Sequence, residues 1–401
     1  MSKKKVLHLA KWYPNKVEPL LGIFIQKHIQ SVQKSYVNKI ISVYQTNTIN
    51  SNIHRVVNHL KNTEEVVFYH KKGFLNKIKV LLRVWKETKL YKPHLIHAHV
   101  MGWTSSLAFF FSRTNHVPFL ISEHWSGYRR NEFVKLNFIS KILRKISAKK
   151  AKQICVVSNF LKQDMLKCGV TANYTIVGNV VNGIASDIGK NKTFSFVFAG
   201  DLVQETKNVK GILEAFYEVI KHHKNIKLDI IGDGKDLKYF KELSHQLELN
   251  NHVSFHGNQS NDYVFKTLSQ SHVLILNSYF ETFSIICAEA LLCGIPVIST
   301  KCGGPESFLN DKTGILIDLD NKKQLTTAME SMINNYNQYE PEKLKSIAHQ
   351  FSMDKIGEKI NFLTAKKLFN DGLKEIFVAN NSLYGKYLHK DYDVKDDKFK
   401  I

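Results

Sequence analysis

The chain has 401 residues, of which 43% are hydrophobic, and this is enough for two domains with cores of their own. Its formal net charge of +22 predicts a surface that attracts polyanions such as nucleic acid, anionic lipid head groups or phosphorylated small molecules. The sequence has no apolar stretch long enough to cross a membrane and no zinc-finger, RNA-recognition or helix-turn-helix signature, which excludes a membrane span and argues against nucleic acid as a partner.

Short apolar segments alternate with longer amphipathic ones in the first half of the chain. Residues 5–10 predict a strand, and residues 22–33 predict a helix because their apolar side chains recur near helical spacing. Further strands, each followed by helix-like sequence, are predicted at 94–100, 118–124 and 153–158. This alternation is typical of a parallel sheet with right-handed crossovers.

The same alternation starts again in the second half. Strands are predicted at 194–200, 227–234, 252–257, 272–277 and 296–300. We therefore expect an α/β protein of two doubly wound, Rossmann-like domains that face each other across a cleft. The expected limits are 1–188 for the first domain, 189–348 for the second, 349–370 for a helix that returns to the first domain, and 371–401 for a polar tail.

One segment of the second domain combines two carboxylates with a helix start. Residues 279–300, YFETFSIICAEALLCGIPVIST, place Glu281 before a predicted helix and Glu289 on its second turn. Ser284 or Thr282 is suited to cap this helix. The free N–H groups and the positive dipole end of its first turn predict an anion site, best suited to a phosphate.

A glycine pair follows the next predicted strand. Gly303 and Gly304 permit positive φ angles and the approach of a ligand to the backbone, although a plain tight turn also uses such a pair. In open parallel sheets, ligands bind beyond the carboxyl ends of the strands. We therefore expect the strand-end loops of both domains to line one cleft.

Segments over most of the chain follow one another in a recognisable order, namely 9–24, 94–99, 121–128, 153–162, 176–182, 196–216, 228–234, 253–258 and 281–307. Together they resemble the retaining glycosyltransferases of family 4, which have the GT-B fold and an E-x7-E segment, here ETFSIICAE. The resemblance covers about residues 5 to 370. It implies a metal-independent enzyme that moves a sugar from a nucleoside-diphosphate-sugar to a glycan or lipid-linked acceptor. Such enzymes serve surface polysaccharide synthesis, for example of lipopolysaccharide or capsule.

The resemblance also implies three catalytic residues. Glu281 matches the acid that contacts the hydroxyls of the donor sugar. Lys207 matches the lysine that neutralises the diphosphate, and His124 matches the histidine of the first domain near the reacting carbon. The retaining reaction implied is a front-face substitution, in which the leaving phosphate helps to deprotonate the acceptor.

Further residues are implied to bind the donor. Glu289 matches the acid that accepts hydrogen bonds from the ribose, and Gly22 matches the glycine whose loop reaches towards donor and acceptor. The backbone near Phe283 and Ser284 is implied to face the diphosphate. The remaining donor-site positions are expected at Gly200, Thr282, Gly303 and Gly304.

The chemistry of the reaction asks for these residue types. Cleavage of a sugar–nucleotide bond develops negative charge on the diphosphate, which a cation and a helix N-terminus stabilise in the absence of a metal. Lys207 and the helix after Ser284 are suited to that task. A carboxylate accepts hydrogen bonds from vicinal hydroxyls, as acids do for ribose in dinucleotide-binding folds.

One position departs from the family pattern. The family commonly has Gly-Arg at the start of the second domain, with the arginine on the diphosphate, whereas this chain has Gly200-Asp201. Either Lys207, Lys210 or Lys301 compensates, or the donor site is weakened. The alternatives to a transferase are therefore a catalytically silent glycan- or nucleotide-binding relative, or a nucleotide-sugar epimerase of the same fold.

We predict neither a metal nor a cofactor besides the donor substrate. His97, His99 and His124 lie in strand-end segments without zinc-like spacing, and the first two point to one side of a strand, where a structural role suits them. The five cysteines lack CxxC pairing, which predicts buried, reduced thiols in a cytoplasmic protein.

Two basic amphipathic segments, 72–92 and 133–153, lie in the first domain. One interpretation is peripheral attachment to the anionic inner face of the membrane, where a lipid-linked acceptor would wait. The other is two ordinary helices with solvated lysines.

Overall fold

The computed structural model describes residues 3–186 and 188–368, and the expected tail 371–401 lies outside the described residues. The first domain is built on a parallel sheet whose strands run in the order β3-β4-β2-β1-β5-β6-β7-β8, with only β3 antiparallel to its neighbour. Its elements are β1 (Lys5–Ala10), α1 (Ile23–Val32), β2 (Val37–Gln45), β3 (Ile53–Leu60), β4 (Thr63–His70), α2 (Phe74–Tyr91), β5 (Leu95–His99), α3 (Trp103–Asn115), β6 (Phe119–Glu123), η1 (Ser126–Tyr128), α4 (Glu132–Lys135), α5 (Phe138–Lys150), β7 (Gln153–Val156), α6 (Asn159–Lys167) and β8 (Tyr174–Ile176).

The second domain has a fully parallel sheet in the order β11-β10-β9-β12-β13-β14. Its elements are β9 (Phe194–Ala199), α7 (Gln204–Lys207), α8 (Val209–Ile220), β10 (Ile226–Ile231), α9 (Leu237–Gln246), β11 (Val253–Gly257), α10 (Asn261–Gln270), β12 (Val273–Leu276), α11 (Ile285–Leu292), β13 (Val297–Thr300), η2 (Gly304–Ser307), β14 (Gly314–Ile317), α12 (Lys322–Asn335), η3 (Tyr336–Gln338) and α13 (Pro341–His349), followed by α14 (Met353–Leu368). The expected fold of two doubly wound α/β domains is confirmed.

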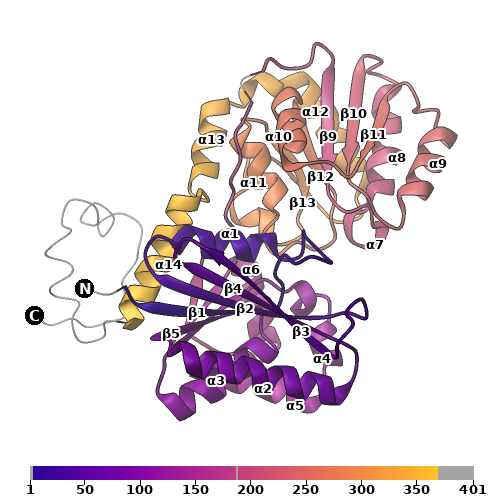
Figure 1. Ribbon diagram of the computed structural model, residues 1–401. Coiled ribbons are helices and arrows are strands. Elements are labelled where there is room, and N and C mark those ends of the chain that lie inside the picture. The colour runs from indigo at the N-terminus through magenta and orange to yellow at the C-terminus, as the bar shows by residue number, and fades with distance from the viewer. Residues whose placement is uncertain (1–2, 187, 369–401) are drawn as a thin grey trace, which may run out of the picture.

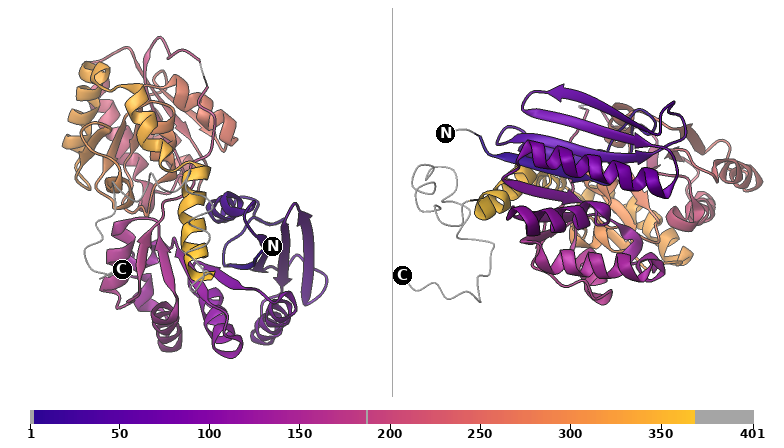
Figure 2. Two further views of the ribbon diagram at one scale, coloured as in Figure 1. Left: turned by 90° about the vertical axis from the view of Figure 1, so that its left-hand side faces the viewer. Right: turned by 60° about the horizontal axis from the view of Figure 1, so that its bottom comes forward.

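Helices cover both faces of the first sheet, which explains why its central strands are buried and rich in apolar residues. Helices α2, α3 and α5 form one layer on the side away from the second domain, and α1 and α14 lie on the other side (Figures 1 and 2). All residues of β5 and β6 are buried between these layers. The first domain therefore turns the layer of α2, α3 and α5 to the outside.

The chain passes between the domains twice. The first passage lies between β8 and β9, and the second lies between α13 and α14 (Figure 1). Helix α14 packs against α1 of the first domain. The passages contact each other, because Val181 N donates to Phe351 O at 2.8 Å. Gly357 permits the close contact of α14 with α1, since a Cβ there would lie 2.5 Å from Ser31 O. The last helix thus ties the second domain back to the first.

None of the described helices is both long and apolar enough to cross a membrane.

Candidate active site

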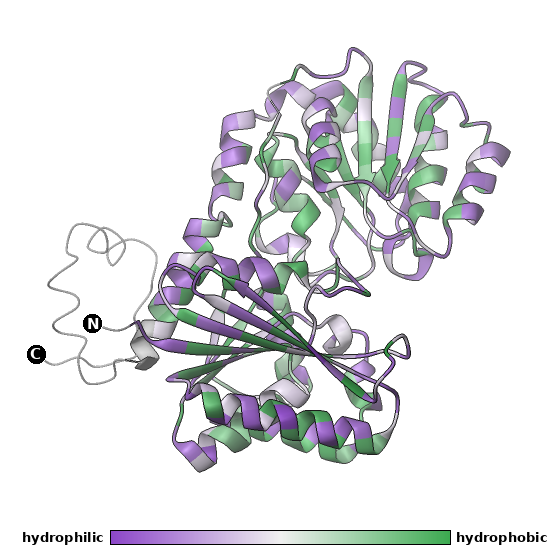
Figure 3. Ribbon diagram, viewed as in Figure 1, coloured by the Kyte–Doolittle hydropathy of each residue, from purple (hydrophilic) through white to green (hydrophobic). Residues whose placement is uncertain are grey.

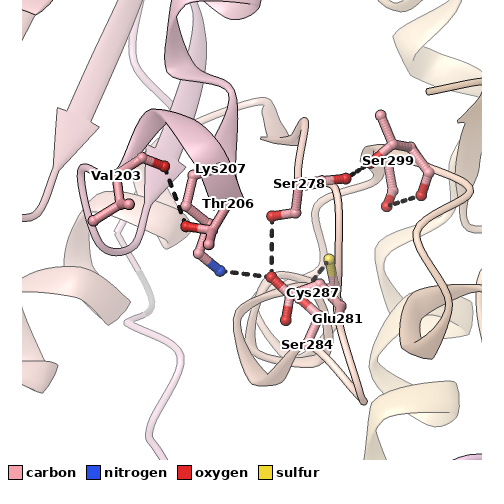
Figure 4. A network of polar contacts seen from close by, with 9 residues as sticks. Val203, Thr206, Lys207, Ser278, Glu281, Ser284, Cys287 and Ser299 are labelled. Carbon is pink, nitrogen blue, oxygen red and sulfur yellow. Dashed lines mark hydrogen bonds and ion pairs between the residues drawn. The ribbon is translucent and has the colours of Figure 1, made fainter. Parts of the chain in front are cut away.

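Glu281 lies in the loop between β12 and α11, at the carboxyl edge of the second sheet. Its carboxylate forms an ion pair with Lys207 at the end of α7, with 2.6 Å between Oε1 and Nζ, and it accepts a hydrogen bond from Ser278 Oγ at 3.0 Å (Figure 4). Backbone contacts hold the loop, because Glu281 N donates to Cys302 O and Gly304 N donates to Glu281 O. The fold therefore brings Lys207 and Glu281, two predicted site residues that lie far apart in the sequence, into direct contact.

Lys207 stays charged in this half-buried place. Burial opposes the ammonium form, but the Glu281 carboxylate outweighs burial, so that the pKa of Lys207 is raised above its usual value. The side chains of Lys207 and Glu281 keep 19% and 15% exposure, so a ligand can reach both. In this arrangement the charges of Lys207 and Glu281 compensate each other.

Helix α11 starts without a side-chain cap. Ser284 occupies the N-cap position in a left-handed conformation (φ 69°, ψ 86°), but its hydroxyl lies 3.2 Å from Cys287 Sγ instead of capping the helix. Thr282 lines a small cavity next to Glu281 and does not cap either. The expectation that Ser284 or Thr282 caps this helix is therefore wrong. The helix start is left uncapped by side chains, which suits an anion.

Glu289 is buried on α11, with 6% of its surface exposed. Burial raises the pKa of its carboxyl to about 7, although Lys27 of α1 lowers it in part. A buried acid in an apolar helix is costly unless a partner or ligand compensates. Lys27 belongs to the first domain, so Glu289 lies close enough to that domain for its charge to act on the carboxyl.

The glycine pair serves contacts within the protein. A Cβ at Gly304 would lie 2.2 Å from Phe283 N, and one at Gly303 would lie 2.0 Å from Nη1 of Arg129, a residue of the first domain. Arg129 Nη1 also donates to Cys302 O at 2.7 Å. The glycines thus let the backbone at 282–283 and an arginine from the opposite domain approach the loop of Glu281.

The side chain of Phe283 belongs to the core and not to the cleft. Its ring centroid lies 4.9 Å from that of Phe351 and 5.3 Å from that of Phe308. A Cβ at Gly178, in the first passage between the domains, would lie 2.9 Å from the Phe283 ring. Phe283 therefore anchors the start of α11 where the chain passes between the domains.

His124 and Gly22 lie on the first-domain side. His124 follows β6, is 6% exposed, and stacks near the rings of Phe24 (4.7 Å) and His28 (5.2 Å). Burial holds the pKa of His124 well below its usual range, although the Asn179 side chain nearby raises it in part. Gly22 precedes α1 at φ 70°, where a Cβ would lie 2.5 Å from Trp12 O. His124 is thus a buried, neutral ring.

The three lysines considered as substitutes for the missing arginine are all paired. Lys207 contacts Glu281, Lys210 lies 3.6 Å from Glu214, and Lys301 lies 2.7 Å from Asp318. Asp201 is exposed after β9 and helps to raise the pKa of Lys207. A Cβ at Gly200 would make ordinary contacts, with Lys207 Cε at 3.7 Å. Of these lysines, Lys207 alone contacts the candidate site residues.

His97 and His99 lie on the same side of β5, as expected, with ring centroids 4.2 Å apart. His97 and His99 share β5, and His8 of β1 joins them, with ligand atoms of the three rings all within 4.8 Å of one another. His8 Nδ1 lies 3.1 Å from His99 Nε2 and His97 Nε2 lies 2.8 Å from Ser122 Oγ. Burial lowers the pKa of all three. They form a neutral hydrogen-bonded cluster inside the sheet, and His124 is not part of it.

Sequence reasoning missed Arg129 and Asp164, which line the small cavity together with Phe280, Glu281 and Thr282. No motif marks either position. Only the three-dimensional structure identifies them, because η1 and α6 lie next to the Glu281 loop only when the two domains pack together.

Two sequence models of glycosyltransferase families match this chain. A sequence model described as "Glycosyltransferase Family 4" matches residues 44–182, and one described as "Glycosyl transferases group 1" matches residues 184–350. Sucrose-phosphate synthase from Thermosynechococcus elongatus is 13% identical and superposes with a TM-score of 0.72 over 94% of this chain and 100% of its own. The chain has the GT-B glycosyltransferase fold. The Anabaena protein HepE, in complex with UDP-glucose, has a TM-score of 0.68 at 14% identity, over 90% of this chain and 99% of its own.

Two relatives by sequence are named as glycosyltransferases. Lipopolysaccharide 1,6-galactosyltransferase from Escherichia coli is 26% identical over 51% of this GT-B chain. An N-acetylgalactosaminyltransferase from Campylobacter jejuni that acts on a diacetylbacillosaminyl-diphospho-undecaprenol is 25% identical over 57% of the chain. The matches span 59% and 63% of the lengths of these two relatives.

Proposed function

We propose that this protein is a retaining glycosyltransferase that moves a sugar from a nucleoside-diphosphate-sugar to a glycan or lipid-linked acceptor in surface polysaccharide synthesis. The observation that carries the proposal is the contact of Lys207 with Glu281 beside the uncapped start of α11. A cation and free helix N–H groups suit a diphosphate, and an acid next to them suits the hydroxyls of the attached sugar. The lipopolysaccharide and diphospho-undecaprenol relatives support the class of product.

In the proposed reaction the bond between the anomeric carbon and the β-phosphate oxygen breaks, and an acceptor hydroxyl forms a bond to that carbon on the same face. The departing phosphate oxygen takes the hydroxyl proton. Lys207 and the first-turn N–H groups of α11 stabilise the charge on the diphosphate. Glu281 accepts hydrogen bonds from the sugar, Glu289 from the ribose, and neutral His124 offers a ring N–H to the sugar on the opposite wall.

A thermal-shift screen of nucleotide-sugars tests the proposal. A ligand present at 100 times its dissociation constant stabilises the folded protein by about 2.7 kcal/mol. We expect one class of nucleotide-sugar to raise the melting temperature in the presence of EDTA, because the site holds the diphosphate with Lys207 rather than a metal. NMR of the product should show the anomeric configuration of the donor. An inverted product would refute the retaining mechanism.

Glu289 should make nucleotide binding depend on pH. The carboxyl has a pKa of about 7 in the free protein, and the ionised form is the better acceptor for two ribose hydroxyls. UDP affinity should therefore rise as the pH increases through 7. Below that pH, UDP binding should release the proton of the Glu289 carboxyl. Calorimetry in buffers of different ionisation enthalpy measures this proton. Glu289→Gln should lose the release, and an unchanged release in this variant would show that another group titrates.

The outer layer of the first domain supports attachment to an anionic membrane. Hydrophobic and hydrophilic residues alternate along the outer helices α2 and α5 (Figure 3). Among the apolar ones, the following side chains are exposed: Phe74, Leu75, Ile78 and Leu82 on α2, and Phe138, Ile139, Ile142 and Ile146 on α5. Phe74 and Phe138 are 77% and 75% exposed. Exposed apolar residues framed by cations are typical of helices that lie in the head-group region.

Vesicle flotation checks this attachment. We expect the protein to float with vesicles that contain anionic phosphatidylglycerol and much less with pure phosphatidylcholine. Replacing Phe74, Leu75, Phe138 and Ile139 with Ser should weaken binding by about tenfold or more, because each buried side chain contributes about 1.5–3 kcal/mol. The matched control Leu319→Ser, exposed on the second domain, should float normally. Equal flotation with both lipids would contradict the attachment.

The two alternatives have less support. The named relatives are transferases and not epimerases, and the described site offers no acid placed for elimination that we can identify. A catalytically silent relative would keep UDP binding and show no transfer with any donor that binds.

A further inference from the structure

A groove of about 540 Å³ opens on the first domain beside the candidate active site. It runs between η1, α5 and α6, and we call it the basic groove because Arg129, Lys141, Lys145 and Lys167 line it. Asp164 contributes the one carboxylate of the lining. Four cations therefore face one anion across this surface.

The basic groove leads to the Glu281 loop. Arg129 and Asp164 line both the groove and the small cavity that is bounded by Glu281 and Thr282. Arg129 reaches across the domain boundary to donate to Cys302 O at 2.7 Å. A molecule lying in the groove would thus have one end at the acid proposed to hold the donor sugar.

The cations of the groove are available to a ligand. Lys141, Lys145 and Lys167 form no ion pair among the described residues. Asp164, the one carboxylate of the lining, can offset only one of the four positive charges. A concave surface lined by one sign of charge concentrates the field and attracts the opposite charge.

We infer that the basic groove binds a phosphoryl group carried by the acceptor and directs the acceptor hydroxyl towards the Glu281 loop. The inference rests on the proposed transferase function, and it names the acceptor class as phosphorylated. Lysine ammonium groups are common phosphate ligands. The phosphate can belong to a lipid carrier or to a soluble sugar. The groove cations suit either one, and the apolar side chains of Phe133 and Val134 in the lining would suit the lipid.

Cys168 gives a direct measurement, since it lines the groove and is half-exposed, whereas the four other cysteines are buried. At alkaline pH its thiolate attacks a disulfide reagent and releases one thiol. The dianion 5,5′-dithiobis(2-nitrobenzoate) is attracted by the groove cations, whereas neutral 4,4′-dithiodipyridine serves as the reference for access to the thiol. The ratio of the two rates should fall by about tenfold or more in Lys141→Gln/Lys145→Gln/Lys167→Gln at low salt.

The control triple variant Lys149→Gln/Lys150→Gln/Lys152→Gln removes three exposed lysines outside the groove lining and should keep the wild-type ratio. A ratio that is unchanged in the groove variant, or that falls equally in both variants, would overturn the inference.

Protection of Cys168 identifies the source of the phosphate. With UDP present to occupy the donor site, inorganic phosphate, glucose 1-phosphate and n-butyl phosphate are each tested as blockers of the neutral reagent. Stronger protection by butyl phosphate indicates a lipid-linked acceptor, and stronger protection by glucose 1-phosphate indicates a soluble one. Both results require that protection is lost in the groove variant. No protection by any of the three would overturn the inference.

Blocking Cys168 connects the groove to transfer. Wild-type protein carrying a bulky maleimide on Cys168 should bind UDP normally but lose transfer from the screened donor to a membrane lipid extract, while Cys168→Ser treated in the same way keeps it. Normal transfer by the blocked protein would refute the groove as the acceptor site. Failure of untreated protein to bind any nucleotide would instead refute the proposed function, and the thiol rates would still report on anion binding.

Discussion

Glu281→Gln should lower the rate of sugar transfer by about 100-fold, since losing one positioned hydrogen-bonding group at a reacting centre, such as an oxyanion-hole donor, costs about 2.7–4 kcal/mol. The variant keeps the shape of the side chain but removes the charge that Lys207 now contacts at 2.6 Å. UDP affinity should stay equal or increase, since Lys207 no longer has to leave a carboxylate to reach the diphosphate. Steady-state kinetics and calorimetry measure the two effects separately.

The opposite directions of these effects make the Glu281 prediction specific. A variant that merely unfolds the loop would weaken both transfer and UDP binding. Full transfer activity in Glu281→Gln would show that this acid does not act on the sugar, and the silent-relative alternative would gain support if the wild type also transferred nothing.

Lys207→Met should weaken UDP binding by about 10- to 100-fold, since hydrogen bonds to charged groups contribute about 1.5–3 kcal/mol. Transfer should fall further, because the diphosphate gains charge as the bond to the sugar breaks. Uridine, which lacks the phosphates, should bind the variant and the wild type equally. Calorimetric titration of UDP and uridine into both proteins gives the comparison.

Lys210→Met is the matched control for Lys207. Lys210 lies three residues further along the chain, is 45% exposed and pairs with Glu214 on the surface of α8. Its removal should change UDP affinity by less than about twofold, as expected for an exposed ion pair. An equal loss in both variants would mean that general surface charge, rather than Lys207, attracts the nucleotide.

The parallel sheets could be predicted from local sequence, whereas Glu281, Glu289 and Lys207 are singled out by the resemblance to family 4 glycosyltransferases. Apolar runs such as 194–200 and 296–300 become strands wherever they are covered on both sides. The segment order then places the loops that follow them at one edge of the sheet. The contact between Lys207 and Glu281 follows from that arrangement.

Other features depend on contacts that no local pattern records. The left-handed Ser284 follows from its position between the buried Phe283 and the helix, so its hydroxyl turns to Cys287 instead of capping. Arg129 meets Gly303 only because two domains approach each other. His8 joins His97 and His99 only because β1 and β5 are neighbours in the sheet.

A crystal structure of the protein with the nucleotide-sugar selected by the screen tests the central claim most directly. The account predicts the diphosphate within hydrogen-bonding distance of Lys207 Nζ and of the first N–H groups of α11, with the ribose at Glu289 and the sugar at Glu281. The ion pair between Lys207 and Glu281 should then be broken or shared with the ligand. A nucleotide bound elsewhere, or bound with that pair intact and the start of α11 empty, would contradict the account.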